Sequence, residues 1–123
     1  MSVDRHKSRP LPLRFGFALR GIAHALSSEA SLKFQAAAGV LAFLVLLLLR
    51  PEALWWGLLA LACGAVLAAE LFNTAIEQLA DALHPHQHPR IAIAKDCAAA
   101  AVLLAVLGAL GVAAAFIAHV VNN

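Results

Sequence analysis

The feature that most constrains the fold is an uncharged run, residues 53 to 69, that leads directly into a polar stripe. Seventeen residues without a charge would cover about 26 Å as a helix, against a hydrocarbon core of roughly 30 Å. Helical spacing then places five polar residues on one face: Glu70, Asn73, Thr74, Glu77 and Asp81. Polar groups are costly in lipid unless they are paired or bind something. We therefore expect a membrane-spanning helix whose polar stripe begins near one edge of the bilayer.

The rest of the chain is too apolar for a soluble domain of 123 residues, since 63% of it is hydrophobic and only 13% is charged. We expect one all-α membrane domain over residues 1–123. Its predicted parts are a basic arm (1–12), an amphipathic helix on the membrane surface (13–27) and transmembrane helices at 31–49, 53–83 and 91–119. Ser27 or Ser28 is expected to cap the 31–49 helix, with Glu29 in its first turn. Cys63 and Cys97 are expected to be free core residues.

The basic residues predict the orientation. The turn between the first and second spans has one basic residue, Arg50. The opposite side of the membrane has eight: Arg5, Lys7, Arg9, Arg14, Arg20 and Lys33 before the first span, and Arg90 and Lys95 after the second. The positive-inside rule places the N-terminus and the 84–90 loop in the cytoplasm. We expect a multi-pass protein of the cytoplasmic (inner) membrane.

Polar residues from three helices should meet at the cytoplasmic edge. The set is Glu29, Glu70, Asn73, Glu77, Lys95 and Asp96. Carboxylate and amide oxygens suit a hard cation such as Mg²⁺, and a bound cation allows a phosphate-bearing ligand to approach carboxylates. The sequence thus predicts a site for a metal and a phosphorylated ligand.

Other readings are weaker. A small proton-coupled transporter would place its carboxylates near the midplane and continue a polar path across the bilayer, but residues 53–69 offer none. A purely structural membrane peptide leaves the acidic set unexplained. The histidines at 84, 86 and 88 lack the spacing and further ligands of a zinc site. The basic N-terminal helix lacks the aromatic interleaving of a nucleic-acid surface, so no nucleic-acid partner is expected.

The motifs resemble the prokaryotic diacylglycerol kinase family, which includes the undecaprenol kinases. The resemblance rests on residues 70–77 (ELFNTAIE), Asp81, residues 94–96 (AKD), residues 98–103, residues 17–22 and Glu29, and it extends over about residues 14–119. It implies a homotrimer with one surface helix and three spans per subunit. It also implies transfer of the ATP γ-phosphate to a lipid hydroxyl, with Mg²⁺ required.

The resemblance also assigns roles to single residues. By this resemblance, Glu70 matches the position of the family's general base, and Glu29 and Glu77 match the positions of its metal ligands. Ala99 matches a position that lines the lipid site. The implied ATP contacts are Phe17, Glu29, Asn73, Glu77, His86, Gln87, His88, Lys95 and Asp96.

Two departures from the family pattern leave alternatives open. Pro10 stands near the place of a phosphate-contacting arginine, and Arg9 and Arg14 are the candidates to replace it. The loop before Ala94-Lys95-Asp96 leans toward the undecaprenol kinases. We expect a diacylglycerol kinase, with undecaprenol kinase as the alternative.

Overall fold

The computed structural model describes residues 9–123, which contain four α-helices. The basic residues Arg5 and Lys7 lie outside the described residues. The helices are α1 (Leu11–Ser28), α2 (Ala30–Leu49), α3 (Ala53–Leu83) and α4 (Pro89–Asn122). The predicted all-α fold is confirmed, and every helix boundary lies within three residues of its expected position. Helix α1 begins before the predicted end of the arm because Pro10 is its N-cap and Pro12 lies in its first turn, where proline is tolerated.

The chain bends between α1 and α2 at Glu29, which has an extended backbone with φ −106° and ψ 114°. The prediction that Ser27 or Ser28 caps α2 is wrong. Their hydroxyls instead donate to the carbonyl of His24, at 2.7 and 2.9 Å, because serine in the last turn of a helix readily bonds back to the preceding turn. Glu29 itself is the N-cap of α2, and its side chain forms no capping hydrogen bond.

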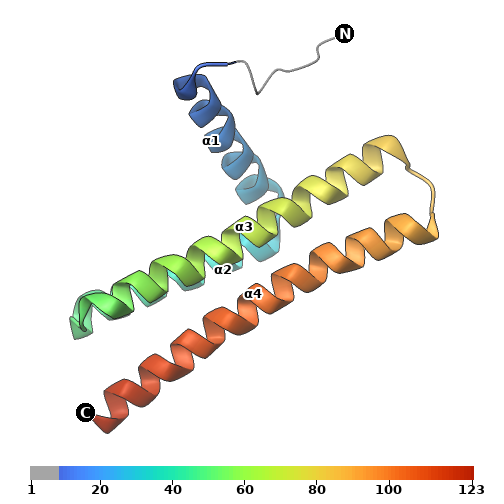
Figure 1. Cartoon of the computed structure of the whole chain (residues 1–123). Helices are drawn as coiled ribbons and strands as arrows, with labels where there is room; N and C mark the ends of the chain where they lie inside the picture. Colours follow the sequence, from blue (N-terminus) through green and yellow to red (C-terminus); the bar gives the residue numbers. More distant parts are fainter. Residues whose placement is uncertain (1–8) are drawn as a thin grey trace.

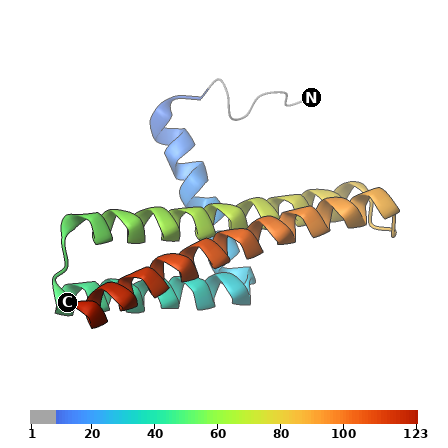
Figure 2. The same cartoon turned by 60° about the horizontal axis from the view of Figure 1, so that its bottom comes forward.

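Helix α3 is the centre of the bundle. Helices α2 and α4 each pack against α3, while within the described residues they make no close backbone approach to each other. Helix α1 runs crosswise to the other three and contacts α2 and α3 (Figure 1). The same arrangement is visible from a second direction in Figure 2. Helix α1 meets the bundle where α2 begins, and a crosswise direction is the one expected for a helix lying on the membrane surface.

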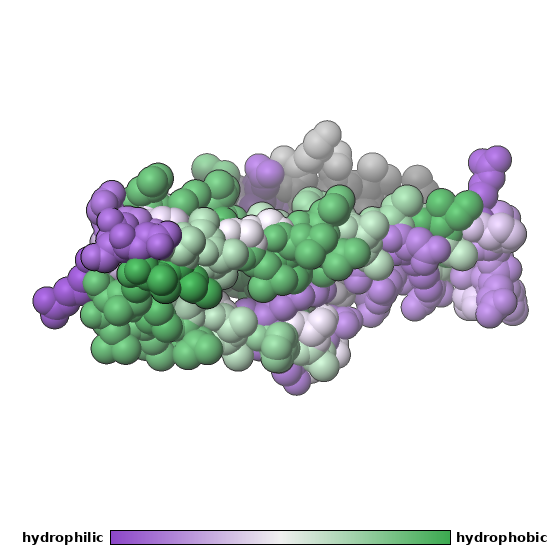
Figure 3. All heavy atoms as spheres, turned by 90° about the horizontal axis from the view of Figure 1, so that it is seen from below, coloured by the Kyte–Doolittle hydropathy of each residue, from purple (hydrophilic) through white to green (hydrophobic). Residues whose placement is uncertain are grey.

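Helices α2, α3 and α4 are each long and apolar enough to cross a membrane. Their 20, 31 and 34 residues correspond to about 30, 46 and 51 Å, so α3 and α4 exceed the roughly 30 Å hydrocarbon core. Figure 3 shows hydrophilic atoms gathered at the end with the α3–α4 loop and reaching inward from it, while apolar atoms cover the middle. The polar ends of α3 and α4 therefore extend beyond the hydrocarbon at the loop end.

Aromatic contacts define the opposite end of the bundle. The Trp55 ring lies 5.1 Å from the Phe116 ring and 5.3 Å from the His119 ring, and Trp56 lies 5.5 Å from Phe43. The end of α2, the start of α3 and the end of α4 thus lie at one level, as expected for an aromatic belt. Arg50 closes α2 in the left-handed conformation (φ 49°) before Pro51.

The single chain buries little of its apolar surface. It exposes 9201 Å², whereas a soluble monomer of this mass would expose about 6,300 Å². The buried apolar residues are Ala25, Leu32, Leu46, Val66 and Ala98. Most apolar side chains of α2, α3 and α4 therefore face outward, which suits contact with lipid or with other subunits.

The close approach of α2 to α3 at Gly39 gives a first prediction. A Cβ atom on this glycine would lie 3.3 Å from the Sγ atom of Cys63, so Gly39→Leu should force the helices apart and lower the free energy of unfolding by about 1–3 kcal/mol. Unfolding in mild detergent measures the loss. Ala38→Leu adds a leucine at the neighbouring exposed position and serves as the control. Equal stability of the two variants would contradict the packing described here.

Candidate functional site

The polar stripe of α3 is buried at its apolar end and exposed at its other end. Glu70 and Thr74 are only 4% and 6% exposed. Asn73 and Glu77 are partly buried, and Asp81 is exposed. This gradient runs along the helix from the uncharged segment toward the α3–α4 loop. Glu70 is therefore the stripe residue that lies next to the uncharged segment and has little access to solvent.

Glu70 is paired with Gln35, a residue that was not predicted from the sequence. The amide Nε2 of Gln35, on α2, donates a hydrogen bond of 2.7 Å to Oε1 of Glu70. Two long apolar stretches are thus joined by a buried polar contact. The available signal was that Gln35 is the last polar residue before the apolar remainder of α2, where a polar side chain tends to need an interhelical partner.

Asn73 and Glu77 form the second polar pair. The amide Nδ2 of Asn73 donates to Oε1 of Glu77 at 3.2 Å, across one helical turn. The Oδ1 atom of Asn73 is buried and has no hydrogen-bond partner. An amide oxygen without a hydrogen-bond partner, beside a carboxylate, provides the oxygen ligands that Mg²⁺ prefers. Asn73 and Glu77 therefore fit the predicted metal.

Glu29 completes the predicted ligand set only in part. Its carboxylate is half-buried at the α1–α2 bend. Among residues 9–123, no three His, Cys, Asp or Glu side chains come together in an arrangement that could hold a metal ion. One chain therefore does not gather the acidic residues into a complete protein cage. Mg²⁺ does not require one, because it commonly keeps water and phosphate oxygens among its ligands.

Lys95 and Asp81 form an ion pair between α4 and α3. The Nζ atom of Lys95 lies 2.7 Å from Oδ1 of Asp81, with the side chains 37% and 67% exposed. Asp81 is solvated, as expected, but it is also paired. Asp96 and Ala99 lie exposed on the same part of α4.

The remaining predicted nucleotide contacts lie on α1 and in the α3–α4 loop. The guanidinium of Arg20 lies 4.8 Å from the centre of the Phe17 ring, and Arg14 is exposed. His86, Gln87 and His88 are all exposed. His88 also has a structural role that was not predicted, because its Nδ1 atom accepts a hydrogen bond of 3.1 Å from the backbone N–H of Arg90 and caps α4.

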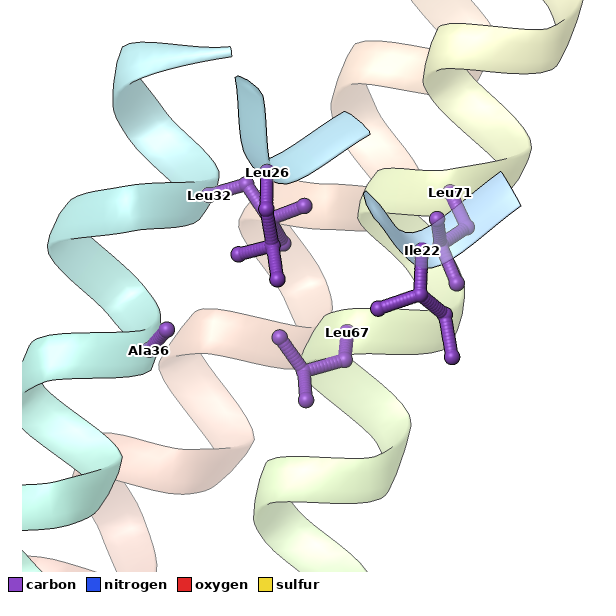
Figure 4. Close-up of a pocket in the computed structure, with 6 residues that line it drawn as sticks. All are labelled: Ile22, Leu26, Leu32, Ala36, Leu67 and Leu71. Carbon is purple, nitrogen blue, oxygen red and sulfur yellow. The ribbon is translucent and has the colours of Figure 1, made fainter. Parts of the chain in front are cut away.

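The described part of the chain contains an apolar pocket of about 120 Å³ (Figure 4). Its walls come from α1, α2 and α3, with the side chains of Ile22, Leu26, Leu32, Ala36, Leu67 and Leu71. On α3, the two lining leucines flank Glu70 along the chain, and on α2 the lining residues flank Gln35 in the same way. A space suited to hydrocarbon therefore lies at the level of Glu70 along the bundle, although neither Glu70 nor Gln35 lines it.

Comparisons with known proteins find similarity to lipid kinases. A family model described as prokaryotic diacylglycerol kinase matches residues 16–117. The chain is 36% identical over 100 residues to a protein named diacylglycerol kinase from Synechocystis sp., covering 80% of this chain and 57% of that protein. It is 35% identical over 88 residues to a protein named undecaprenol kinase from Bacillus subtilis, covering 72% of each.

The exposure of the Lys95–Asp81 pair predicts a small energetic effect. An exposed ion pair contributes about 0–1 kcal/mol, so Asp81→Asn should lower the thermal stability only slightly, and less still in 1 M salt, where the attraction is screened. Thermal unfolding in mild detergent at low and high salt measures both effects. A large, salt-independent loss would show that the pair is buried in the assembled protein.

Proposed function

This chain belongs to the prokaryotic diacylglycerol kinase family, and we propose that it is a membrane lipid kinase that transfers the γ-phosphate of ATP to a lipid hydroxyl. Diacylglycerol is the proposed acceptor, and undecaprenol is the alternative. The observation that carries the proposal is the position of Glu70. This carboxylate is 4% exposed, follows the uncharged segment of α3 and lies at the level of an apolar pocket that Leu67 and Leu71 line.

Glu70 is the proposed general base. A lipid substrate stays in the bilayer while ATP stays in water, so the base must lie where the two meet and within hydrogen-bond reach of the hydroxyl. Glu70 accepts the hydroxyl proton as the lipid oxygen forms a bond to the γ-phosphorus. The bond from that phosphorus to the bridging oxygen breaks, and ADP leaves with the bond's electron pair. Ala99 is the proposed contact to the lipid on α4.

Glu29 and Glu77 are the proposed Mg²⁺ ligands. Mg²⁺ supplies charge neutralisation between these carboxylates and the triphosphate. Asn73 holds Glu77 through its amide N–H and retains a buried oxygen without a partner. The other proposed nucleotide contacts are Phe17, His86, Gln87, His88, Lys95 and Asp96, with Arg14 as a candidate phosphate contact.

A homotrimer in the cytoplasmic (inner) membrane, with the N-terminus and the site on the cytoplasmic side, is the proposed assembly and location. Two observations support self-association. The chain leaves much of its apolar surface uncovered, and several helical glycines have no neighbouring atoms within 4 Å of the position that a Cβ atom would take. Such glycines allow another helix to approach closely. They are Gly57, Gly64, Gly108 and Gly111.

The activity is tested with the purified protein in mixed micelles. We expect ATP-dependent phosphorylation of diacylglycerol, measured as labelled lipid phosphate. A parallel reaction with undecaprenol identifies the acceptor, because the faster of the two substrates at equal surface concentration is the one the site favours. Absence of labelled product from both lipids would overturn the proposed function.

Glu70→Gln should abolish most turnover while the protein stays folded. The amide keeps the shape of the side chain but cannot accept the proton, so kcat should fall about a hundredfold or more. The KM for MgATP should change little, because the proposed metal ligands remain. Glu52→Gln makes the same change at the opposite end of the bundle and is the control. Ordinary turnover in Glu70→Gln, or a defect confined to nucleotide affinity, would refute the assignment.

Glu29→Gln and Glu77→Gln should each impair metal use. We expect the Mg²⁺ concentration at half-maximal rate to rise by at least about tenfold, as for other changes at metal sites, together with a severe loss of activity. Stability need not fall, because each change removes a charge that is partly desolvated. Mg²⁺ titrations of the initial rate measure the effect. Near-normal activity at low Mg²⁺ in either variant would show that its carboxylate is not a ligand.

A further inference from the structure

We propose that Gln35 is the residue that positions Glu70 for catalysis, an inference that rests on the proposed function. Gln35 lies on α2 and Glu70 on α3, and the hydrogen bond between them spans 2.7 Å. Within the described residues, Gln35 supplies the only side-chain hydrogen bond to Glu70. The geometry of the carboxylate is therefore set by a neighbouring helix.

The contact uses one carboxylate oxygen and leaves the other available. Gln35 donates to Oε1 of Glu70, so Oε2 remains to accept the proton of the lipid hydroxyl. A glutamate side chain has several rotatable bonds, and a small misplacement of a catalytic group can reduce the rate strongly. A fixed rotamer removes that loss. Gln35 thus acts through Glu70 and does not itself take the proton.

A neutral amide suits this role in an apolar setting. Lysine or arginine at the same place would bring a second charge into the membrane, which is costly, and would form an ion pair with the base. The glutamine amide donates to the carboxylate without adding charge. It has no basic group that competes for the hydroxyl proton at neutral pH.

The other end of the same amide argues against a purely stabilising role. The Oε1 atom of Gln35 is buried and has no hydrogen-bond partner. Leaving a buried acceptor unpaired costs free energy, and this cost offsets part of the stabilisation that the hydrogen bond to Glu70 supplies. The observed glutamine keeps its donor directed at Glu70 despite that cost.

The position of the pair relative to the pocket supports the same role. In the sequence, Gln35 lies between the lining residues Leu32 and Ala36, and Glu70 lies between the lining residues Leu67 and Leu71. The hydrogen-bonded pair is thus at the same level of the bundle as a space that suits the hydrocarbon of a lipid. The hydrogen bond fixes the base at the place where a lipid hydroxyl would arrive.

A double-mutant cycle tests the proposal in the full-length protein. Gln35→Met keeps the length of the side chain and removes the donor. We expect kcat to fall by at least about tenfold, the loss expected for one hydrogen bond to a charged group, with the KM for MgATP within about twofold of the parent. In the Glu70→Gln background the same change should cost less than about twofold, because the residue it acts through is already disabled.

Two further variants make the result specific. Gln78→Met makes the same substitution at an exposed position of α3 and should leave turnover unchanged. Gln35→Asn keeps a polar amide but is one methylene shorter, so it should fold normally and still lose turnover. Thermal unfolding of each variant in detergent shows whether the protein remains folded.

The outcomes separate this inference from the proposed function. Equal losses from Gln35→Met in the parent and in the Glu70→Gln background would overturn the positioning role, as would losses that follow the melting temperature. Normal turnover in Gln35→Met, together with an inactive Glu70→Gln protein, would overturn only this inference. A parent protein that phosphorylates neither lipid, or an active Glu70→Gln protein, would overturn the proposed function itself.

Discussion

The burial of one carboxylate at the end of an apolar helix is the constraint on which the rest of the structure depends. Glu70 is 4% exposed, and a polar group in that position is unfavourable unless a partner satisfies it. The partner comes from α2, whose Gln35 donates to it. This contact joins α2 to α3, the helix against which α4 also packs. Gly39 allows the close approach of α2 that the contact requires.

Helix length determines where the chemistry can occur. Helix α2 has 20 residues, about the thickness of the hydrocarbon, whereas α3 and α4 are longer. Their extra turns carry Glu77 and the Lys95–Asp81 pair, and they lead to the loop with His84, His86 and His88. Asn73 and Glu77, on the proposed nucleotide side, and Glu70, on the proposed lipid side, therefore belong to one continuous helix, α3. A kinase that joins a soluble donor to a membrane acceptor requires this kind of continuity.

The fold could be predicted from the sequence because it follows from local patterns. The uncharged run, the proline at position 51 and the loop prolines define the helix ends, and α3 has the expected bounds. The errors concern choices between similar hydrogen bonds. The hydroxyls of Ser27 and Ser28 could cap α2 or bond to a backbone carbonyl of α1. They donate to the carbonyl of His24 in α1. Gln35 was not predicted because a single polar residue forms no pattern along a helix. Its role becomes apparent only when its partner on α3, Glu70, is known. The geometry of the acidic set depends on packing between helices, which no local pattern specifies.

The hydrogen bonds divide the site into two parts, and each part keeps one buried amide oxygen without a partner among the described residues, on Gln35 and on Asn73. Glu70 has its partner within one chain, and it lies at the level of the apolar pocket. Asn73 holds Glu77 but keeps a buried oxygen without a partner, and Glu29 lies on a different element from both. A buried acceptor without a donor is uncommon in a folded protein, and hard oxygen atoms of this kind are satisfied by a cation. The pair on the proposed lipid side is therefore formed by the fold of a single chain. On the proposed nucleotide side, a metal with its triphosphate would supply the interactions that bring the oxygen atoms together.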